Sequence, residues 1–104
     1  MIFLRVSSRS EQVAERIAKM LLEEKLVIDM NMKRHIERLE LRDGKLVPER
    51  IFLLTSKTKG LLFPTIDKLL KSQFGNDVEE IYSLPIVHMD WDEAQHLQTD
   101  VKAV

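Results

Sequence analysis

Cysteine is missing from the 104-residue sequence. Its absence excludes a disulfide framework, an iron–sulfur cluster, a cysteine-ligated zinc site and a thiol nucleophile. Glycine is scarce, with three residues, and the sequence contains no glycine-rich phosphate loop, no G-x-S-x-G motif and no H-E-x-x-H motif. We therefore expect a protein that is not an enzyme and that has no required cofactor.

Neither sign of charge is in large excess. Lysine and arginine number 16 against 17 acidic residues, which gives a net charge of −1. Without an overall basic field to attract phosphate groups, nucleic acid is not an expected partner. No run of about 18 apolar residues occurs, so we expect no membrane span, and the apolar stretch at the start is too short for a signal peptide. We expect a single domain, residues 1–104, in the cytoplasm.

Residues 25–58 predict a long β-hairpin. Asp43-Gly44 is a favoured pair for a two-residue type I′ turn, in which both central residues have positive φ. The flanking segments are rich in the β-branched and large apolar residues typical of strands. Ile36 and Leu39 fall on opposite faces of the first strand, so we expect a bulge or bend near Glu37 and Arg38.

The rest of the chain alternates between strands and helices. Apolar periodicity predicts strands at 2–6 and 81–87 and helices that end near residues 24, 74 and 102. Ser8 or Ser10 is the expected cap of the first helix, Thr58 that of the second, and Gly75 its end. The order β-α-β-β-α-β predicts an α+β, ferredoxin-like sandwich with a long bent β-hairpin and an additional C-terminal helix.

The stretch Ile51–Leu54 is apolar at every position, which indicates a strand that requires cover on both faces. One layer of helices protects only one face of a sheet. We therefore expect the opposite face to contact another copy of the chain.

Several segments, in this order and spacing, resemble the CutA family of divalent cation tolerance proteins. They are Ala14–Ala18, Leu22–Leu26, Asn31, Asp43–Lys45, Leu53–Thr58, Glu80-Ile81 and Leu84–Ile86. The resemblance covers essentially the whole chain. It implies a homotrimer in which the long hairpins extend between neighbouring subunits, and it implies that at least some members bind copper or other divalent metals.

The sequence also departs from the family at three places. Asp29 stands where members often carry a cysteine, and Arg42 replaces the usual aromatic residue before the hairpin turn. A His-Pro-Tyr-Glu-like stretch is replaced by residues 74–80. The resemblance therefore supports the fold and the trimer more strongly than the metal chemistry.

Four residues are candidate metal ligands. His88 and Asp90 follow the last predicted strand, and a loop imidazole beside a carboxylate suits a borderline divalent ion. The alternative is a solvated loop whose aspartate caps the next helix. Met30 and Met32 share a strand face, and their thioethers would suit Cu(I). The alternative is that both methionines fill gaps in the core.

Other combinations are weaker candidates. Asp92 and His96, four residues apart, could meet on one helix face, whereas His35 has cationic neighbours that disfavour a metal. A group of lysines could instead hold an anion at a subunit boundary: Lys57, Lys59, Lys68 and Lys71. This second reading predicts a trimeric small-molecule sensor resembling the PII signalling proteins, or a scaffold without metal binding. A solvated helix face is the simpler explanation of most of these lysines.

Overall fold

A computed structural model describes residues 1–104. It contains four strands, three α-helices and two short 3₁₀ turns, one on each side of the second helix. The elements are β1 (Ile2–Ser8), α1 (Glu11–Glu23), β2 (Ile28–Arg42), β3 (Lys45–Thr58), α2 (Phe63–Phe74), β4 (Glu80–Pro85) and α3 (Trp91–Asp100).

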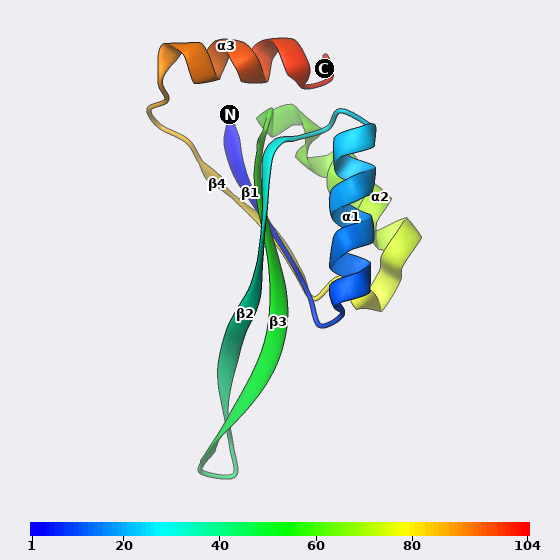
Figure 1. Cartoon of the computed structure of the whole chain (residues 1–104), viewed down its shortest axis with the longest axis vertical. Helices are drawn as coiled ribbons and strands as arrows, with labels where there is room; N and C mark the ends of the chain where they lie inside the picture. Colours follow the sequence, from blue (N-terminus) through cyan, green and yellow to red (C-terminus); the bar gives the residue numbers. More distant parts are fainter.

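The strands form one antiparallel sheet in the order β2-β3-β1-β4. Figure 1 shows α1 and α2 on one side of this sheet and α3 across one of its ends, near both chain termini. The hairpin of β2 and β3 extends from the opposite end, and the molecule measures 48 × 29 × 20 Å. This arrangement confirms the expected α+β fold, and its strand order is consistent with the ferredoxin-like topology.

The core lies between the sheet and the helices and consists of 15 apolar residues. Burial of each large side chain contributes roughly 1.5–3 kcal/mol relative to an exposed position. Leu4, Leu54, Ile66 and Leu97 are at most 1% exposed and come from β1, β3, α2 and α3. All three helices therefore belong to a single packed unit with the sheet.

Both ends of α1 are closed by local hydrogen bonds. The Ser10 hydroxyl accepts a hydrogen bond from the Val13 amide at 3.2 Å, so Ser10, not Ser8, is the helix cap. At the other end Lys25 has a φ of 56°. Its amide donates to Leu22 O and the Leu26 amide donates to Leu21 O. These two bonds form a Schellman motif, which turns the chain sharply toward β2.

The hairpin turn forms as predicted, but the bulges lie elsewhere. Asp43 and Gly44 both have positive φ, at 51° and 77°. The register of β2 and β3 is regular from Ile36 to the turn, and it shifts between Ile28 and Asn31 and between Lys33 and Ile36. The prediction of a bulge near Glu37 and Arg38 was therefore wrong. The extra residue of the bulge lies between Lys33 and Ile36, and it places the Ile36 side chain on the face opposite that of Met32. Ile36 and Leu39 then lie on opposite faces by the ordinary alternation of a strand.

Thr58 does not cap α2. It is the last residue of β3 and fully buried, and its hydroxyl donates to Leu26 O at 2.6 Å. A 3₁₀ turn, Gly60–Leu62, separates it from α2, where Pro64 occupies the first turn. Gly75, with a φ of 54°, ends this helix as expected. The predicted cap does not form because the Thr58 hydroxyl donates instead to Leu26 O, a carbonyl far away in the sequence.

The last strand and helix agree with their predicted positions. Strand β4 is an edge strand that ends at Pro85, where a missing amide donor is tolerated. Helix α3 is anchored to the body because the Lys102 amide donates to Lys25 O at 2.8 Å. None of the helices is both long and apolar enough to cross a membrane.

The sheet face opposite the helices is better covered than the sequence indicated. Ile51 and Leu53 are only 7% and 5% exposed within the single chain, although they lie outside the main core. Leu53 lies between Ser7 and Lys33, its partners on the two adjacent strands. The exposed apolar residues of this face are Tyr82 and Leu84 of β4, at 40% and 48%. Further out on the hairpin, Leu39, Leu41 and Leu46 are 58%, 71% and 67% exposed, but the register places them on the same face as Leu54, the helix side. The single chain therefore leaves two apolar surfaces for a second copy to cover: the β4 side of this face and the end of the hairpin.

Candidate functional site

The segment between β4 and α3 carries the first candidate metal ligands. His88 is exposed. One oxygen of Asp90 accepts hydrogen bonds from the amides of Asp92 and Glu93, at 3.1 and 3.4 Å, and so caps α3. This aspartate has the capping role that the sequence left as an alternative. Its second carboxylate oxygen takes part in no hydrogen bond or ion pair within the chain.

No group of three or more histidine, aspartate or glutamate side chains is arranged to hold a metal ion. A divalent site with a protein-only ligand set generally uses three or four such donors. His88 and Asp90 therefore constitute at most part of a site within one chain, and further ligands would have to be water or residues of another subunit.

Met30 and Met32 lie at the base of β2 and pack against the core cluster, where both are partly buried. Their positions match the alternative in which methionine fills gaps in the core. Copper binding by their sulfur atoms remains a prediction.

Most of the remaining candidates, Lys68 excepted, have partners of their own. His96 pairs with Asp100, one turn further along α3, and not with Asp92. Lys57 pairs with Asp29 and Glu93. The Lys59 ammonium donates to the carbonyls of Val101 and Lys102, and Lys71 pairs with Asp67. The lysines therefore do not form one group of free cations.

Five charged residues, here called the Arg38 cluster, form a network that joins the hairpin to the body. They are Arg9, Arg38, Glu49, Glu79 and Glu80. Arg38 of β2 binds Glu49 of β3 at 3.2 Å, Glu80 of β4 at 2.8 Å, and Glu79. Arg9 contacts Glu49 and Glu79 from the turn between β1 and α1. The network thus links four separate segments of the chain.

These contacts shift the pKa of two members of the Arg38 cluster. Hydrogen bonds first to Glu79 and then to Glu49 raise the pKa of Arg38 above its usual value. For Glu49, burial alone would raise the pKa, but the hydrogen bond and charge of Arg38 and the charge of Arg9 outweigh it and hold the pKa below its usual value. Glu49 is therefore a stable carboxylate at neutral pH.

The sequence contains part of the signal for this cluster. A two-residue turn at Asp43 and Gly44 places Arg38 opposite Glu49, as the observed register does. The pairing with Glu79 and Glu80 depends on tertiary structure and has no local signal.

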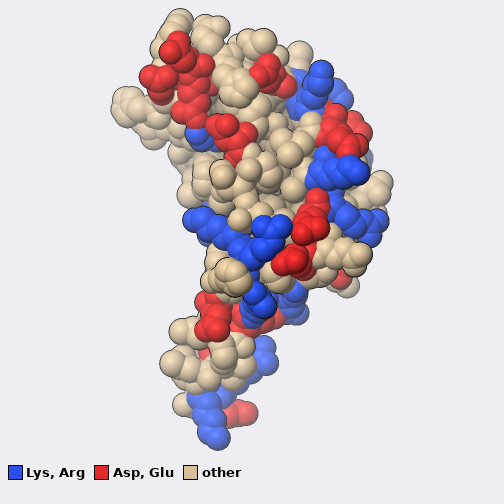
Figure 2. Space-filling model, in the orientation of Figure 1, with Lys and Arg blue, Asp and Glu red and all other residues tan.

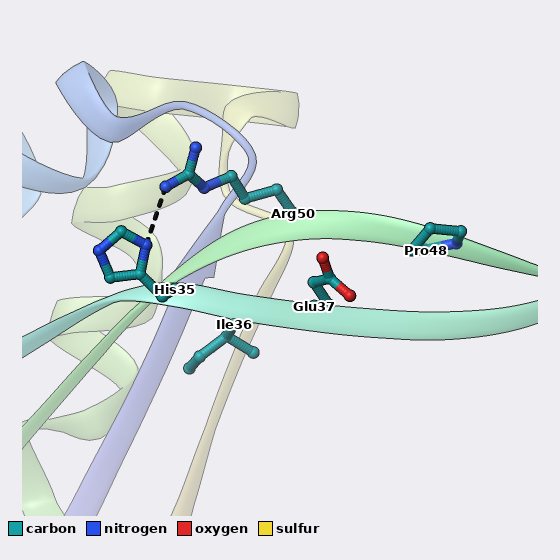
Figure 3. Close-up of a pocket in the computed structure, with 5 residues that line it drawn as sticks. All are labelled: His35, Ile36, Glu37, Pro48 and Arg50. Atoms are coloured by element: carbon teal, nitrogen blue, oxygen red, sulfur yellow. Dashed lines mark hydrogen bonds between the residues drawn. The ribbon is translucent and has the colours of Figure 1, made fainter.

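The hairpin also carries an open hollow of about 630 Å³, lined by His35, Ile36, Glu37, Pro48 and Arg50. Figure 3 shows the His35 ring and the Arg50 guanidinium converging on one side of the strands, whereas the Ile36 side chain points to the other side. One nitrogen of Arg50 lies 3.1 Å from His35 Nδ1. In the sequence, His35 stood out only as a poor metal ligand, and no local pattern indicated this hollow.

Comparison with known proteins decides the family. Residues 2–99 match the family model described as CutA1 divalent ion tolerance protein. The chain is a member of the CutA1 family. The match confirms the resemblance found in the sequence and places this CutA1 family member among proteins described by their role in divalent ion tolerance.

Relatives of this CutA1 family member support the assignment. The divalent-cation tolerance protein CutA of Thermus thermophilus is 33% identical over 87 residues, which cover 79% of this chain and 84% of the relative. A solved structure of Cut A1 from Thermus thermophilus has a TM-score of 0.83 at 28% identity, with 98% and 100% of the two chains covered. A solved structure described as the periplasmic divalent cation tolerance protein CutA of Archaeoglobus fulgidus has a TM-score of 0.79 at 25% identity, with 98% and 100% covered.

Proposed function

We propose that this CutA1 family member is a homotrimeric, non-catalytic protein that binds divalent cations, with copper as the first candidate, and acts in cation tolerance in the cytoplasm. The observation that carries the proposal is the family match over residues 2–99. The name of the Thermus thermophilus relative, a divalent-cation tolerance protein, supports the same function.

The exposed end of the hairpin supports the trimer. Leu41 and Leu46 are direct cross-strand partners, and Leu39 pairs with Pro48 two positions away, so these apolar side chains share one face. All three leucines are more than half exposed in the single chain. Hairpins that extend between neighbouring subunits would bury this face, which is the arrangement that the CutA resemblance implies.

Light scattering tests the assembly. At micromolar concentration we expect the mass of three chains of 12.2 kDa. The double variant Leu41→Lys, Leu46→Lys should dissociate because it places charge in the interface. Leu61→Lys is the control, since Leu61 is 77% exposed but lies in the 3₁₀ turn that follows the other end of β3. A monomeric mass for the unmodified chain would contradict the trimer.

For the metal, we propose His88 and Asp90 as partial ligands of a weak site, completed by water or by a neighbouring subunit. The free oxygen of Asp90 and the exposed imidazole of His88 are the two available donors. Met30 and Met32 are the alternative for Cu(I). Their packing in the core requires some local opening before an ion could reach the sulfur atoms.

Native mass spectrometry with Cu(II) or Zn(II) at a few equivalents tests this proposal. We expect a fixed number of ions per trimer and a loss of roughly tenfold or more in affinity for His88→Ala. His96→Ala is the matched control, because His96 is exposed but pairs with Asp100. Unchanged affinity for His88→Ala would reject the placement, and Met30→Leu with Met32→Leu would then test the thioethers.

A further inference from the structure

The hollow on the hairpin holds an arginine that is fixed in position without a carboxylate partner. Arg50 Nε donates to Arg34 O at 3.3 Å, and its guanidinium carbon lies 5.6 Å from the centre of the Phe52 ring. Nη2 is in contact with His35 Nδ1. These contacts leave the Nη1 amino group free. An arginine held by neutral partners retains its full charge for a ligand.

The same contact defines the proton position on His35. A guanidinium has only donors, so His35 Nδ1 must accept the hydrogen bond from Arg50. In the neutral ring the proton then resides on Nε2, which is a donor. Arg50 and His35 therefore present two neighbouring hydrogen-bond donors, a suitable pair for a carboxylate group.

Glu37 provides the opposite charge in the hollow. It lies directly across from Arg50 in the register of β2 and β3, and both side chains line the hollow. Arg50 is turned toward His35 and away from Glu37, as Figure 3 shows. Arg34, by contrast, has its charge matched by Glu11 and Glu15 of α1. The hollow therefore holds one cation and one carboxylate that are not paired with each other.

We propose that this hollow binds a small zwitterion of the α-amino acid class. Its carboxylate would accept hydrogen bonds from Arg50 Nη1 and His35 Nε2, and its ammonium group would bind Glu37. A simple anion would be repelled by Glu37 and a simple cation by Arg50, whereas a zwitterion matches both charges. The volume of about 630 Å³ lies within the range of small-molecule sites.

The affinity should be modest because the hollow is open to water in the single chain; it stays open in the trimer only if the contacts of the hairpin face end at Leu39, since Glu37, Pro48 and Arg50 lie on that same face. Exposed charge pairs contribute little each, so we expect a dissociation constant on the order of 1 mM. The site needs neither a metal ion nor the ligands proposed for one. Its failure would therefore leave the cation-binding proposal unaffected, and the reverse also holds.

An NMR titration of the full chain tests the inference. Glycine is the probe, and acetate and methylammonium are controls that each carry one of its two charges, all at constant ionic strength. We expect saturable shifts of the backbone amides at residues 35–37 and 50 with glycine, and binding at least tenfold weaker for either control. Equal shifts with acetate, or no saturable shift with glycine, would overturn the proposal.

Two variants test which residue of the hollow binds the carboxylate of the ligand and which binds its ammonium group. Arg50→Gln should weaken glycine binding about tenfold, and Glu37→Gln should weaken glycine while strengthening acetate, because the repelling carboxylate is gone. Arg42→Gln is the control, since Arg42 is a hairpin arginine that pairs with Glu40 outside the hollow. An unchanged ratio of glycine to acetate affinity in Glu37→Gln would reject the role of Glu37.

Discussion

Both halves of the hairpin carry large apolar residues, but in opposite environments. At the base, β3 passes between β1 and β2, and the six residues from Ile51 to Ser56 are all buried. Beyond the body, the same two strands pair regularly with each other, but Leu39, Leu41 and Leu46 remain exposed. Figure 2 shows the narrow distal hairpin with charged groups and uncharged surface side by side.

The base and the distal part of the hairpin are therefore stabilised by different interactions. The base is fixed by burial of apolar surface against the helices, which is the largest stabilising contribution in a small domain. The distal part depends on its hydrogen-bonded ladder and on the Arg38 cluster, because an isolated two-stranded hairpin is only marginally stable. Its exposed leucines suit an interface more than they suit a core.

The largest expected effect comes from removing a leucine at the base. Leu54 is 1% exposed, and Leu54→Ala should lower the free energy of unfolding by about 2–5 kcal/mol because it leaves a cavity in the core. Urea denaturation at a fixed protein concentration measures this loss. Leu46→Ala should cost clearly less at a protein concentration low enough to keep the chain monomeric, because Leu46 is 67% exposed in the single chain. Similar losses at the two positions would remove the distinction between base and tip.

The buried hydrogen bond from Thr58 to Leu26 O provides a second test of the difference between the base and the tip of the hairpin. Thr58→Val keeps the shape of the side chain but leaves Leu26 O without its donor, so we expect a loss of about 1–3 kcal/mol in the free energy of unfolding. Thr99→Val, at an exposed site of α3, is the control and should change little. If the two valine variants were equally stable, the hydrogen bond to Leu26 would not contribute to closing the base of the hairpin.

The smallest effect should come from the Arg38 cluster and should depend on pH. Because the pKa of Glu49 is lower in the folded state, its contribution to stability is present above its unfolded pKa, about 4.3, and is lost as the pH falls through the folded value. Melting temperatures of the unmodified chain and of Glu49→Gln should therefore differ most near neutral pH.

That difference should shrink as the pH falls below about 4. Glu40→Gln is the control, since Glu40 pairs only with Arg42, a neighbour on its own strand. Hydrogen exchange of the amides at residues 38–49 gives a second measurement: their protection factors, which correct for the slower intrinsic exchange in acid, should fall as the pH is lowered. A constant difference from neutral to acid pH would contradict the role assigned to Glu49.

Local patterns were sufficient to predict the element order, the turn at Asp43 and Gly44 and the helix end at Gly75, because each depends on neighbouring residues. The cover of Leu53, the buried bond of Thr58 and the contacts of Arg38 with Glu79 join residues far apart in the sequence. Their positions follow from the folded sheet. For the candidate site, the sequence identified the capping aspartate, whereas the hollow beside His35 required knowledge of where the bulge lies.

The chain ends and the hairpin turn lie at opposite ends of the molecule (Figure 1). A fluorophore or affinity handle attached at either terminus would therefore sit far from the turn along the 48 Å dimension. When such a handle tethers the protein to a sensor chip, the hairpin should face the solution. Paired with a dye at Lys45, beside the turn, a terminal dye gives an intramolecular ruler that reports any bending of the hairpin relative to the body.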